Sequence, residues 1–200
     1  MVEFFLNNKK VVAKDDETIW AVAKREGIKL PHLCFADKPG YRADGNCRAC
    51  MVSIEGERVL AASCIRKPTE GMKVLTNDER SIKSRKMVLE LLVTDQPDRD
   101  TSHDPDSHFW KIASDIDVEK SRFEKREKKI VPCEDSSHVA MSVNLDACIH
   151  CNLCVRACRE VQVNDVIGMG NRGHHSKVVF DFNDPMGDSS CVSCGECVQA

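Results

Sequence analysis

The sequence CIHCNLCVRAC at Cys148–Cys158 is followed by a second cysteine-rich stretch, CVSCGEC, at Cys191–Cys197. Both stretches begin with the spacing Cys-x2-Cys-x2-Cys, so the C-terminal part of the chain contains an internal repeat. Three thiolates this close in sequence wrap one corner of a cubane cluster, whereas the further cysteine of the first stretch turns away to serve the other cluster of a pair. The pattern therefore predicts two 4Fe–4S sites in one small domain.

The repeat also predicts how the ligands are divided. One 4Fe–4S site is expected to use Cys158 together with Cys191, Cys194 and Cys197. The other is expected to use Cys148, Cys151 and Cys154 with a fourth thiolate three residues beyond Cys197, which falls just past Ala200. We therefore expect the sequence to be part of a longer chain, with the isolated Cys133 and His150 outside both ligand sets.

A third cysteine group lies near the N-terminus and has a different spacing, Cys34-x12-Cys47-x2-Cys50-x13-Cys64. A 2Fe–2S cluster needs four thiolates, two on each iron, and one close pair with two separated loop cysteines supplies them. The loop ADGNCRAC contains glycine and small residues, which let backbone amides approach the cluster sulfides. Four cysteines also satisfy a zinc ion, but structural zinc sites usually use two close pairs. The spacing therefore favours 2Fe–2S, with zinc as the alternative.

The segments around this group predict a short helix packed on a mixed sheet. Strands are expected at 4–6 and 11–13, and again at 51–54, 59–63 and 73–75. Asp15 and Asp16 offer oxygen atoms to cap a helix that buries Ile19, Val22 and Ala23 and ends at Gly27.

A stretch without cysteines joins the two cysteine-rich parts. Residues 79–94 predict a helix whose buried stripe includes Ile82, Met87 and Leu91, and a second helix is expected over 109–118. After it, strands are expected at 143–146, 161–167 and 177–182. The chain is accordingly divided into a 2Fe–2S domain at 1–77, a helical connector at 78–137 and a double 4Fe–4S domain at 138–200. The fold class is α+β.

Composition narrows the function classes. The formal net charge of −3 favours neither nucleic acid nor an anionic membrane as a partner. The chain also contains twelve cysteines. No run approaches the roughly 20 apolar residues needed to span a bilayer, and the N-terminus lacks the order of a secretory signal. We therefore expect a cytoplasmic protein, in which reduced thiols bind metal rather than form disulfides.

The order of motifs resembles the N-terminal iron–sulfur region of the molybdenum- or tungsten-containing α subunit of NAD-dependent formate dehydrogenase. The residues that carry the resemblance are PHLC (31–34), GNCRACMV (45–52), LAASC (60–64), CIHCNLCVRACREVQ (148–162) and CVSCGECVQA (191–200). The long-loop 2Fe–2S motif is also similar to that of the NADH dehydrogenase large subunit and of the NAD-reducing hydrogenase small subunit. This resemblance implies a ubiquitin-like β-grasp fold for the 2Fe–2S domain and a ferredoxin-like fold for the double 4Fe–4S domain.

The resemblance also implies a role. Electrons would pass from a molybdopterin site, in a part of the parent protein outside this sequence, through the clusters toward a flavin- and NAD-binding partner and other iron–sulfur subunits. The chain itself shows no catalytic dyad or phosphate-binding loop, so it is expected to be a relay and not an enzyme. The alternatives are the small electron-transfer subunit of an NAD-reducing hydrogenase and a zinc-stabilised interaction module.

These families usually carry one further 4Fe–4S cluster in the connector, bound by His-x3-Cys-x2-Cys-x5-Cys. The corresponding positions here hold Gln96, Asp100, His103 and Phe109, none of which is a thiolate. We therefore expect this cluster to be absent.

Overall fold

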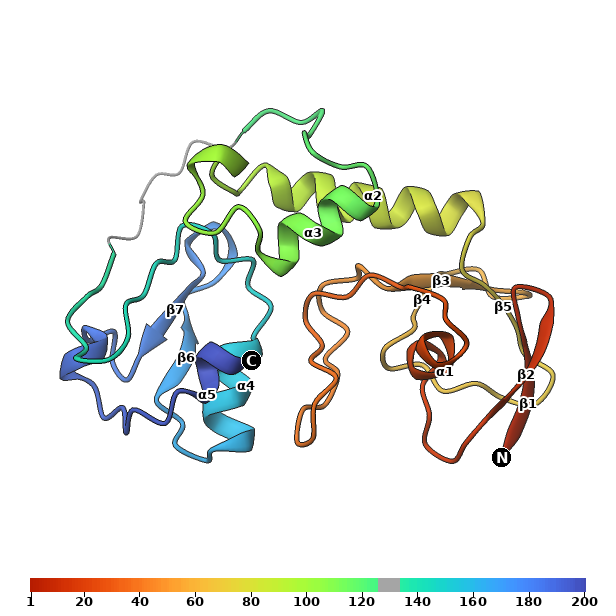
Figure 1. The fold of residues 1–200 in the computed structure, drawn as a ribbon, viewed down its shortest axis with the longest axis horizontal. Coiled ribbons are helices and arrows are strands. Elements are labelled where there is room, and N and C mark those ends of the chain that lie inside the picture. Colours follow the sequence, from red (N-terminus) through yellow and green to blue (C-terminus); the bar gives the residue numbers. More distant parts are fainter. Residues whose placement is uncertain (126–133) are drawn as a thin grey trace. The chain divides into compact units, whose positions relative to one another are not determined.

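A computed structural model describes residues 1–125 and 134–200 of the chain (Figure 1). The chain forms two compact units, each built from segments that are not contiguous in sequence. The first unit contains residues 1–35, 43–93 and 106–124. The second unit contains residues 36–42 and 94–105 together with the described residues from Lys125 onward. Among the described residues, no helix has the length and apolar character needed to cross a bilayer.

The first unit is built on a five-stranded sheet in the order β2-β1-β5-β3-β4. Strands β1 (Val2–Leu6) and β2 (Lys9–Ala13) form the expected hairpin, and Asn7 and Asn8 take the left-handed backbone conformation that a two-residue turn requires. Strand β1 then pairs in parallel with β5 (Lys73–Leu75), whereas β3 (Met51–Ile54) pairs antiparallel with both β5 and β4 (Ala61–Ala62). The predicted strand over 59–63 is thus shorter in the structure.

Helix α1 (Ile19–Arg25) lies against the sheet and fills the core of this unit (Figure 1). The predicted cap at Asp15 and Asp16 is wrong, because the hydroxyl of Thr18 accepts the Ala21 N–H at 3.2 Å and begins the helix. Thr18 immediately precedes the first helical residue in extended backbone, the geometry that an N-cap needs. Gly27 follows the last turn with φ +77°, as predicted for a helix end.

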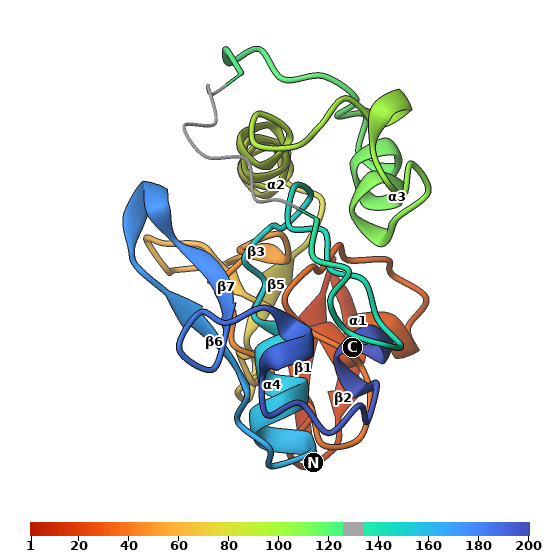
Figure 2. The same ribbon diagram turned by 90° about the vertical axis from the view of Figure 1, so that its left-hand side faces the viewer.

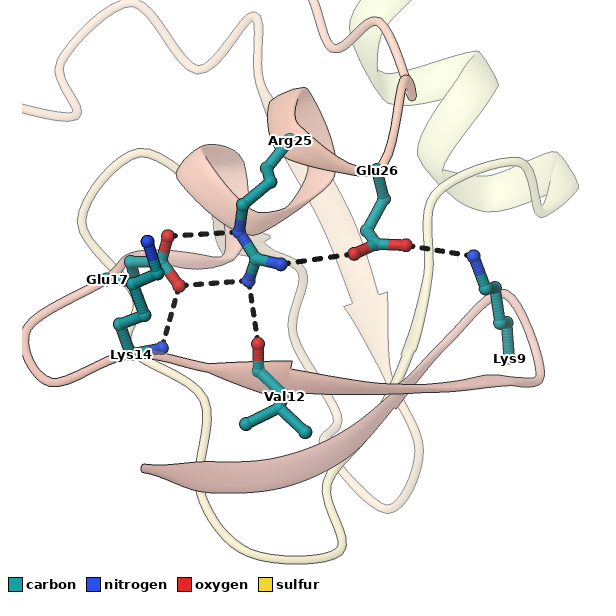
Figure 3. Close-up of polar contacts among 6 residues, drawn as sticks. All are labelled: Lys9, Val12, Lys14, Glu17, Arg25 and Glu26. Atoms are coloured by element: carbon teal, nitrogen blue, oxygen red, sulfur yellow. Dashed lines mark hydrogen bonds and ion pairs between the residues drawn. The ribbon is translucent and has the colours of Figure 1, made fainter.

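Arg25 ties the end of α1 to the hairpin, as Figure 3 shows. Its Nη2 donates to the Val12 carbonyl at 2.6 Å, and its Nε donates to Glu17 Oε1 at 3.3 Å. Glu26 accepts from Arg25 at 3.2 Å and from Lys9 at 2.9 Å, so one chain of ion pairs runs from the hairpin turn to the helix.

Helix α2 (Glu79–Val93) has the predicted bounds to within one residue, but the prediction of its buried face is wrong. The buried residues recur every four positions, at Ser81, Arg85, Leu89 and Val93, whereas Ile82 and Leu91 are exposed. Polar atoms decide this orientation: Arg85 Nη1 donates to the Met51 carbonyl at 3.3 Å and Ser81 hydrogen-bonds Ser53 at 3.3 Å. Helix α3 (His108–Asp115) follows and buries Phe109, Trp110, Ile112 and Ala113.

The second unit has little regular structure around a small apolar core. Helix α4 (Leu153–Arg156) continues into a π-helical turn at Ala157–Val161, and β6 (Ile167–Gly170) pairs with β7 (Lys177–Phe180), as Figure 2 shows. Helix α5 (Glu196–Gln199) lies beside α4. Single 3-10 turns occupy Arg99–Thr101, Gly173–His175 and Met186–Asp188.

Two strand predictions in this unit are wrong. The strand expected over 161–167 begins only at Ile167, because the π-helical turn carries the helical backbone to Val161. The strand expected over 143–146 is reduced to a single bridge between Val143 and Asp135. The strand expected over 177–182 is present as far as Phe180.

Candidate iron–sulfur cluster sites

The first cysteine group lies on loops of the first unit at the edge of its core. Cys34, Cys50 and Cys64 are buried, and Cys47 is partly buried. The Cys47 N–H donates to Cys34 Sγ at 3.5 Å, and the Ala49 N–H donates to Cys47 Sγ at 3.5 Å. Amide donors to thiolate sulfur are the contacts that stabilise an anionic cluster. Ala49 belongs to the loop ADGNCRAC, whose backbone amides were predicted to approach the cluster sulfides.

The thiols of this group form two hydrogen-bonded pairs, Cys34 with Cys47 and Cys50 with Cys64. The hydrogen bond between Cys34 and Cys47 raises the pKa of Cys34 and lowers the pKa of Cys47 to about 5. In the other pair, the hydrogen bond with Cys64 lowers the pKa of Cys50 to about 7, whereas the pKa of Cys64 is raised. The sulfurs of Cys50, Cys34 and Cys47 all raise the pKa of Cys64, so the fold brings the four predicted ligands into one neighbourhood.

The second group of four meets at one cavity of the second unit. Cys158 comes from the first half of the repeat, and it lines this cavity with Cys191, Cys194 and Cys197 of the other half. The apolar side chains of Met141, Val166 and Ile167 form part of the same wall. The Val166 N–H donates to Cys158 Sγ at 3.3 Å, and Asn164 Nδ2 approaches Cys194 Sγ at 4.0 Å. Neither Val166 nor Asn164 had a signal in the sequence.

The remaining three cysteines of the repeat also lie near one another. Burial raises the pKa of Cys154 to about 12, and the neighbouring Cys151, Cys148 and Cys197 raise it further. These contributions indicate that the three thiols of the first stretch share one region of the unit. The three-thiolate corner that the sequence predicts for them stays a prediction.

The backbone conformation is the same at matching positions of the two cysteine stretches. In the first half His150 and Asn152 have φ of 53° and 62°, and the matching Ser193 and Gly195 of the second half have 58° and 74°. The third cysteine of each stretch is then the second residue of a four-residue helix, α4 or α5. In proteins, successive right- and left-handed residues can turn backbone N–H groups toward an anion. The left-handed residues repeated here are compatible with such an arrangement around each stretch.

Gln96, Asp100 and His103 belong to the second unit and Phe109 belongs to the first. The absence of a cluster at these four positions stays a prediction from the sequence. Cys133 lies outside the described residues. Within the part of the chain that the structure describes, no three His, Cys, Asp or Glu side chains stand at the spacing that a single metal ion requires. The fit to clusters therefore rests on the cavity, the amide donors and the repeated backbone.

Family models match both cysteine-rich parts of the chain. Residues 1–79 match the model described as a 2Fe-2S iron-sulfur cluster binding domain, and residues 147–200 match the 4Fe-4S dicluster domain. A chain in the crystal structure of an NAD+-reducing NiFe-hydrogenase in the H2-reduced state has the same fold, with a TM-score of 0.81 at 24% identity. That likeness covers 95% of this chain and 80% of the other.

Curated relatives extend the similarity. The chain is 29% identical over 204 residues to the NADP-reducing hydrogenase subunit HndD of Solidesulfovibrio fructosivorans, which covers 99% of this chain and 34% of HndD. It is 28% identical over 168 residues to a putative formate dehydrogenase of Staphylococcus haemolyticus, covering 84% of this chain and 17% of that protein. It is 28% identical over 183 residues to the mitochondrial NADH-ubiquinone oxidoreductase 78 kDa subunit of Candida albicans. That alignment covers 88% of this chain and 25% of the 78 kDa subunit.

The chain thus spans at most about a third of the length of these relatives, 34% in HndD and 17% in the putative formate dehydrogenase. The two matched ranges of this chain contain all the cysteines predicted as ligands, in the first and the second unit respectively. The chain is therefore an iron–sulfur electron-transfer module, in which a 2Fe–2S cluster binding domain is followed by a 4Fe–4S dicluster domain.

Proposed function

We propose that the chain relays electrons through three clusters whose ligands are the cysteines predicted from the sequence. A 2Fe–2S cluster is held by Cys34, Cys47, Cys50 and Cys64. One 4Fe–4S cluster is held by Cys158, Cys191, Cys194 and Cys197. A second 4Fe–4S cluster is held by Cys148, Cys151 and Cys154 with a thiolate from outside this sequence.

The observation that carries this proposal is the cavity shared by Cys158 and the three cysteines of the other half. Cys158 is separated from the other three by more than thirty positions in the sequence. Their convergence supports the exchange of one ligand between the halves that two-cluster ferredoxins show.

The β-grasp fold is likewise proposed for the first unit. Its support is the opening hairpin, the parallel pairing of β1 with β5 and the single helix α1 packed on the mixed sheet.

The residues around the clusters set the conditions for transfer. Bound iron–sulfur clusters each carry one electron at a time, at a potential set by charge, hydrogen bonds to sulfur and exposure. The N–H groups of Cys47, Ala49 and Val166 point at ligand sulfurs and favour the anionic state. Burial of Cys34, Cys50, Cys64 and Cys158 limits water at the same sites.

We propose that this relay works in the α subunit of a cytoplasmic NAD-dependent formate dehydrogenase. Its electrons would come from a molybdopterin site, with molybdenum or tungsten, elsewhere in that protein and leave toward a flavin- and NAD-binding partner. The similarity to a putative formate dehydrogenase over 84% of the chain supports this assembly.

A second assembly, the small electron-transfer subunit of an NAD-reducing hydrogenase, has its own support. The structurally similar chain comes from a crystal structure of an NAD+-reducing hydrogenase and is covered over 80% of its length. The two assemblies are distinguished in the intact complex by the reductant that bleaches the clusters. Reduction by formate and not by H2 supports the formate dehydrogenase; the reverse supports the hydrogenase.

Metal analysis of the anaerobically purified protein tests the relay itself. Iron, acid-labile sulfide and zinc are counted on one sample, and EPR spectra are recorded after dithionite reduction. We expect a 2Fe–2S signal together with 4Fe–4S signals and little zinc. Stoichiometric zinc without sulfide, after anaerobic reconstitution, would overturn the relay and leave a zinc-stabilised interaction module.

A further inference from the structure

A buried arginine lies, in the sequence, between a predicted ligand of one 4Fe–4S cluster and a predicted ligand of the other. Arg156 is the last residue of α4, two positions from Cys154 and two from Cys158, and it is only 3% exposed. Its guanidinium donates to the carbonyl of Cys151 at 3.4 Å and to the carbonyl of Asn152 at 3.4 Å. The charge is therefore held against the backbone of the first cysteine stretch.

A segment distant in sequence covers this arginine. Residues 36–42 belong to the second unit, and within them the Arg42 carbonyl accepts a hydrogen bond from Arg156 Nη1. Tyr41 is 8% exposed, and its hydroxyl donates to Glu196 Oε1 at 2.8 Å. Arg42 itself pairs with Glu160 at 2.7 Å. These contacts anchor the 36–42 segment on α5 and on the π-helical turn, and they keep water from Arg156.

The same contacts bring the arginine close to the second cysteine stretch. Burial and the hydrogen bond to Glu196 raise the pKa of Tyr41 to about 12, and both Arg156 and Cys197 act on that hydroxyl. Arg156 and Cys197 therefore lie within electrostatic reach of one side chain. Segment 36–42 thus links Arg156, through the Arg42 carbonyl, to Glu196, which is the residue before Cys197.

A buried charge carries a large desolvation cost unless other groups compensate for it. Reduction adds a negative charge to an already anionic cluster, and a cation favours that step more strongly where the local dielectric is low. We propose that the guanidinium of Arg156 raises the reduction potential of the 4Fe–4S clusters of the dicluster domain and so acts as a potential-tuning residue. This inference rests on the proposed function, because it needs the clusters to be bound.

Arg159 provides a matched control on the same stretch of backbone. It lies next to Cys158 and carries the same charge, but its side chain is 54% exposed and pairs with Asp165 at 2.5 Å. Water and the paired carboxylate screen its charge from the clusters. Removal of a charge at this position is therefore expected to have a much smaller effect than removal at Arg156.

The test is an EPR-monitored redox titration of the intact protein in the forms Arg156→Gln, Arg156→Lys and Arg159→Gln, each with iron and sulfide counted. We expect Arg156→Gln to weaken the one-electron reduction of at least one 4Fe–4S cluster about tenfold, which is a shift of about 59 mV to lower potential. Arg156→Lys keeps the charge and should recover most of that shift. Arg159→Gln should change the potential by less than a third as much, and the 2Fe–2S potential should not move in any variant.

Several results would overturn the inference. Equal shifts in Arg156→Gln and Arg159→Gln would show that burial does not matter, and unchanged 4Fe–4S potentials at full iron content would show that the charge does not matter. Loss of the 4Fe–4S clusters in Arg156→Gln, with the 2Fe–2S cluster intact, would assign the residue a structural role instead. A parent protein that contains zinc and no sulfide would refute the proposed function itself, which separates the two failures.

Discussion

Replacing Cys158 by alanine tests the assignment of ligands across the two halves of the repeat. Cys158 is buried and lines the cavity with Cys191, Cys194 and Cys197, so its removal leaves three thiols at that site. We expect the variant to lose the whole cluster there, about four irons and four sulfides per chain. The 2Fe–2S signal should be retained, because Cys34, Cys47, Cys50 and Cys64 lie in the other unit.

Comparing single and double variants tests directly whether Cys158 and Cys194 bind the same cluster. Cys194→Ala removes another thiol from the same cavity, so Cys158→Ala and Cys194→Ala should each cause the same loss. Two ligands of one cluster act as a unit, and the double variant should therefore lose no more iron than either single variant. Cys151→Ala removes a thiol from the first stretch and should affect a different EPR signal.

The assay is iron and sulfide content after anaerobic reconstitution, with EPR to identify the cluster that is lost. The assignment would be refuted if the Cys158→Ala/Cys194→Ala double variant lost about four irons more than either single variant. It would also be refuted if Cys158→Ala and Cys151→Ala removed the same signal. In either case Cys158 would serve the cluster of its own half, and the cavity geometry would not report the ligand set.

Two further predictions concern the stability of the first unit. Phe4 is fully buried, so Phe4→Ala should lower the free energy of unfolding by about 3–5 kcal/mol in a urea titration; Val12→Ala, at a position 40% exposed, should change it by no more than about 0.5 kcal/mol. Arg25→Ala should cost less than about 1 kcal/mol, because its ion pairs are partly exposed, and the cost should shrink in high salt. The hydrogen bond from Arg25 holds the pKa of Glu17 below its usual value, so this stabilisation is present at neutral pH and is lost as the pH falls through the folded-state pKa. Stability curves of Arg25→Ala and the parent should therefore converge in acid; curves that stay parallel would contradict this account.

Local patterns in the sequence were sufficient for much of the first unit. The hairpin, the bounds of α2 and the helix end at Gly27 depend on nearest neighbours along the chain, and each was predicted. The buried face of α2 was not, because the helix turns Ser81 and Arg85 inward to bond groups on β3. An apolar stripe alone misplaces a helix whose packing is decided by hydrogen bonds to a strand.

The residues that surround the cysteines of the second unit could not be predicted from local sequence patterns, because they come from distant parts of the chain. The 36–42 segment reaches Arg156, Glu160 and Glu196 through hydrogen bonds between residues 114 to 155 positions apart. In the sequence this segment is only part of a long loop between two cysteines. No periodicity or turn signal encodes a contact of that range, so the burial of Arg156 became visible only in the structure.

The repeated left-handed residues connect the folding of the second unit to its chemistry. Three of the four, His150, Asn152 and Ser193, are not glycines, and such backbone is costly unless the surroundings impose it. Among the residues that the structure describes, this unit has a two-stranded sheet and a small apolar core to stabilise these loops, and a two-stranded sheet is marginal by itself. Bonds from thiolates to a cluster supply the missing constraint, as metals do in other small domains. On the proposed function, the same cysteines that carry the electrons therefore hold the strained loops in place.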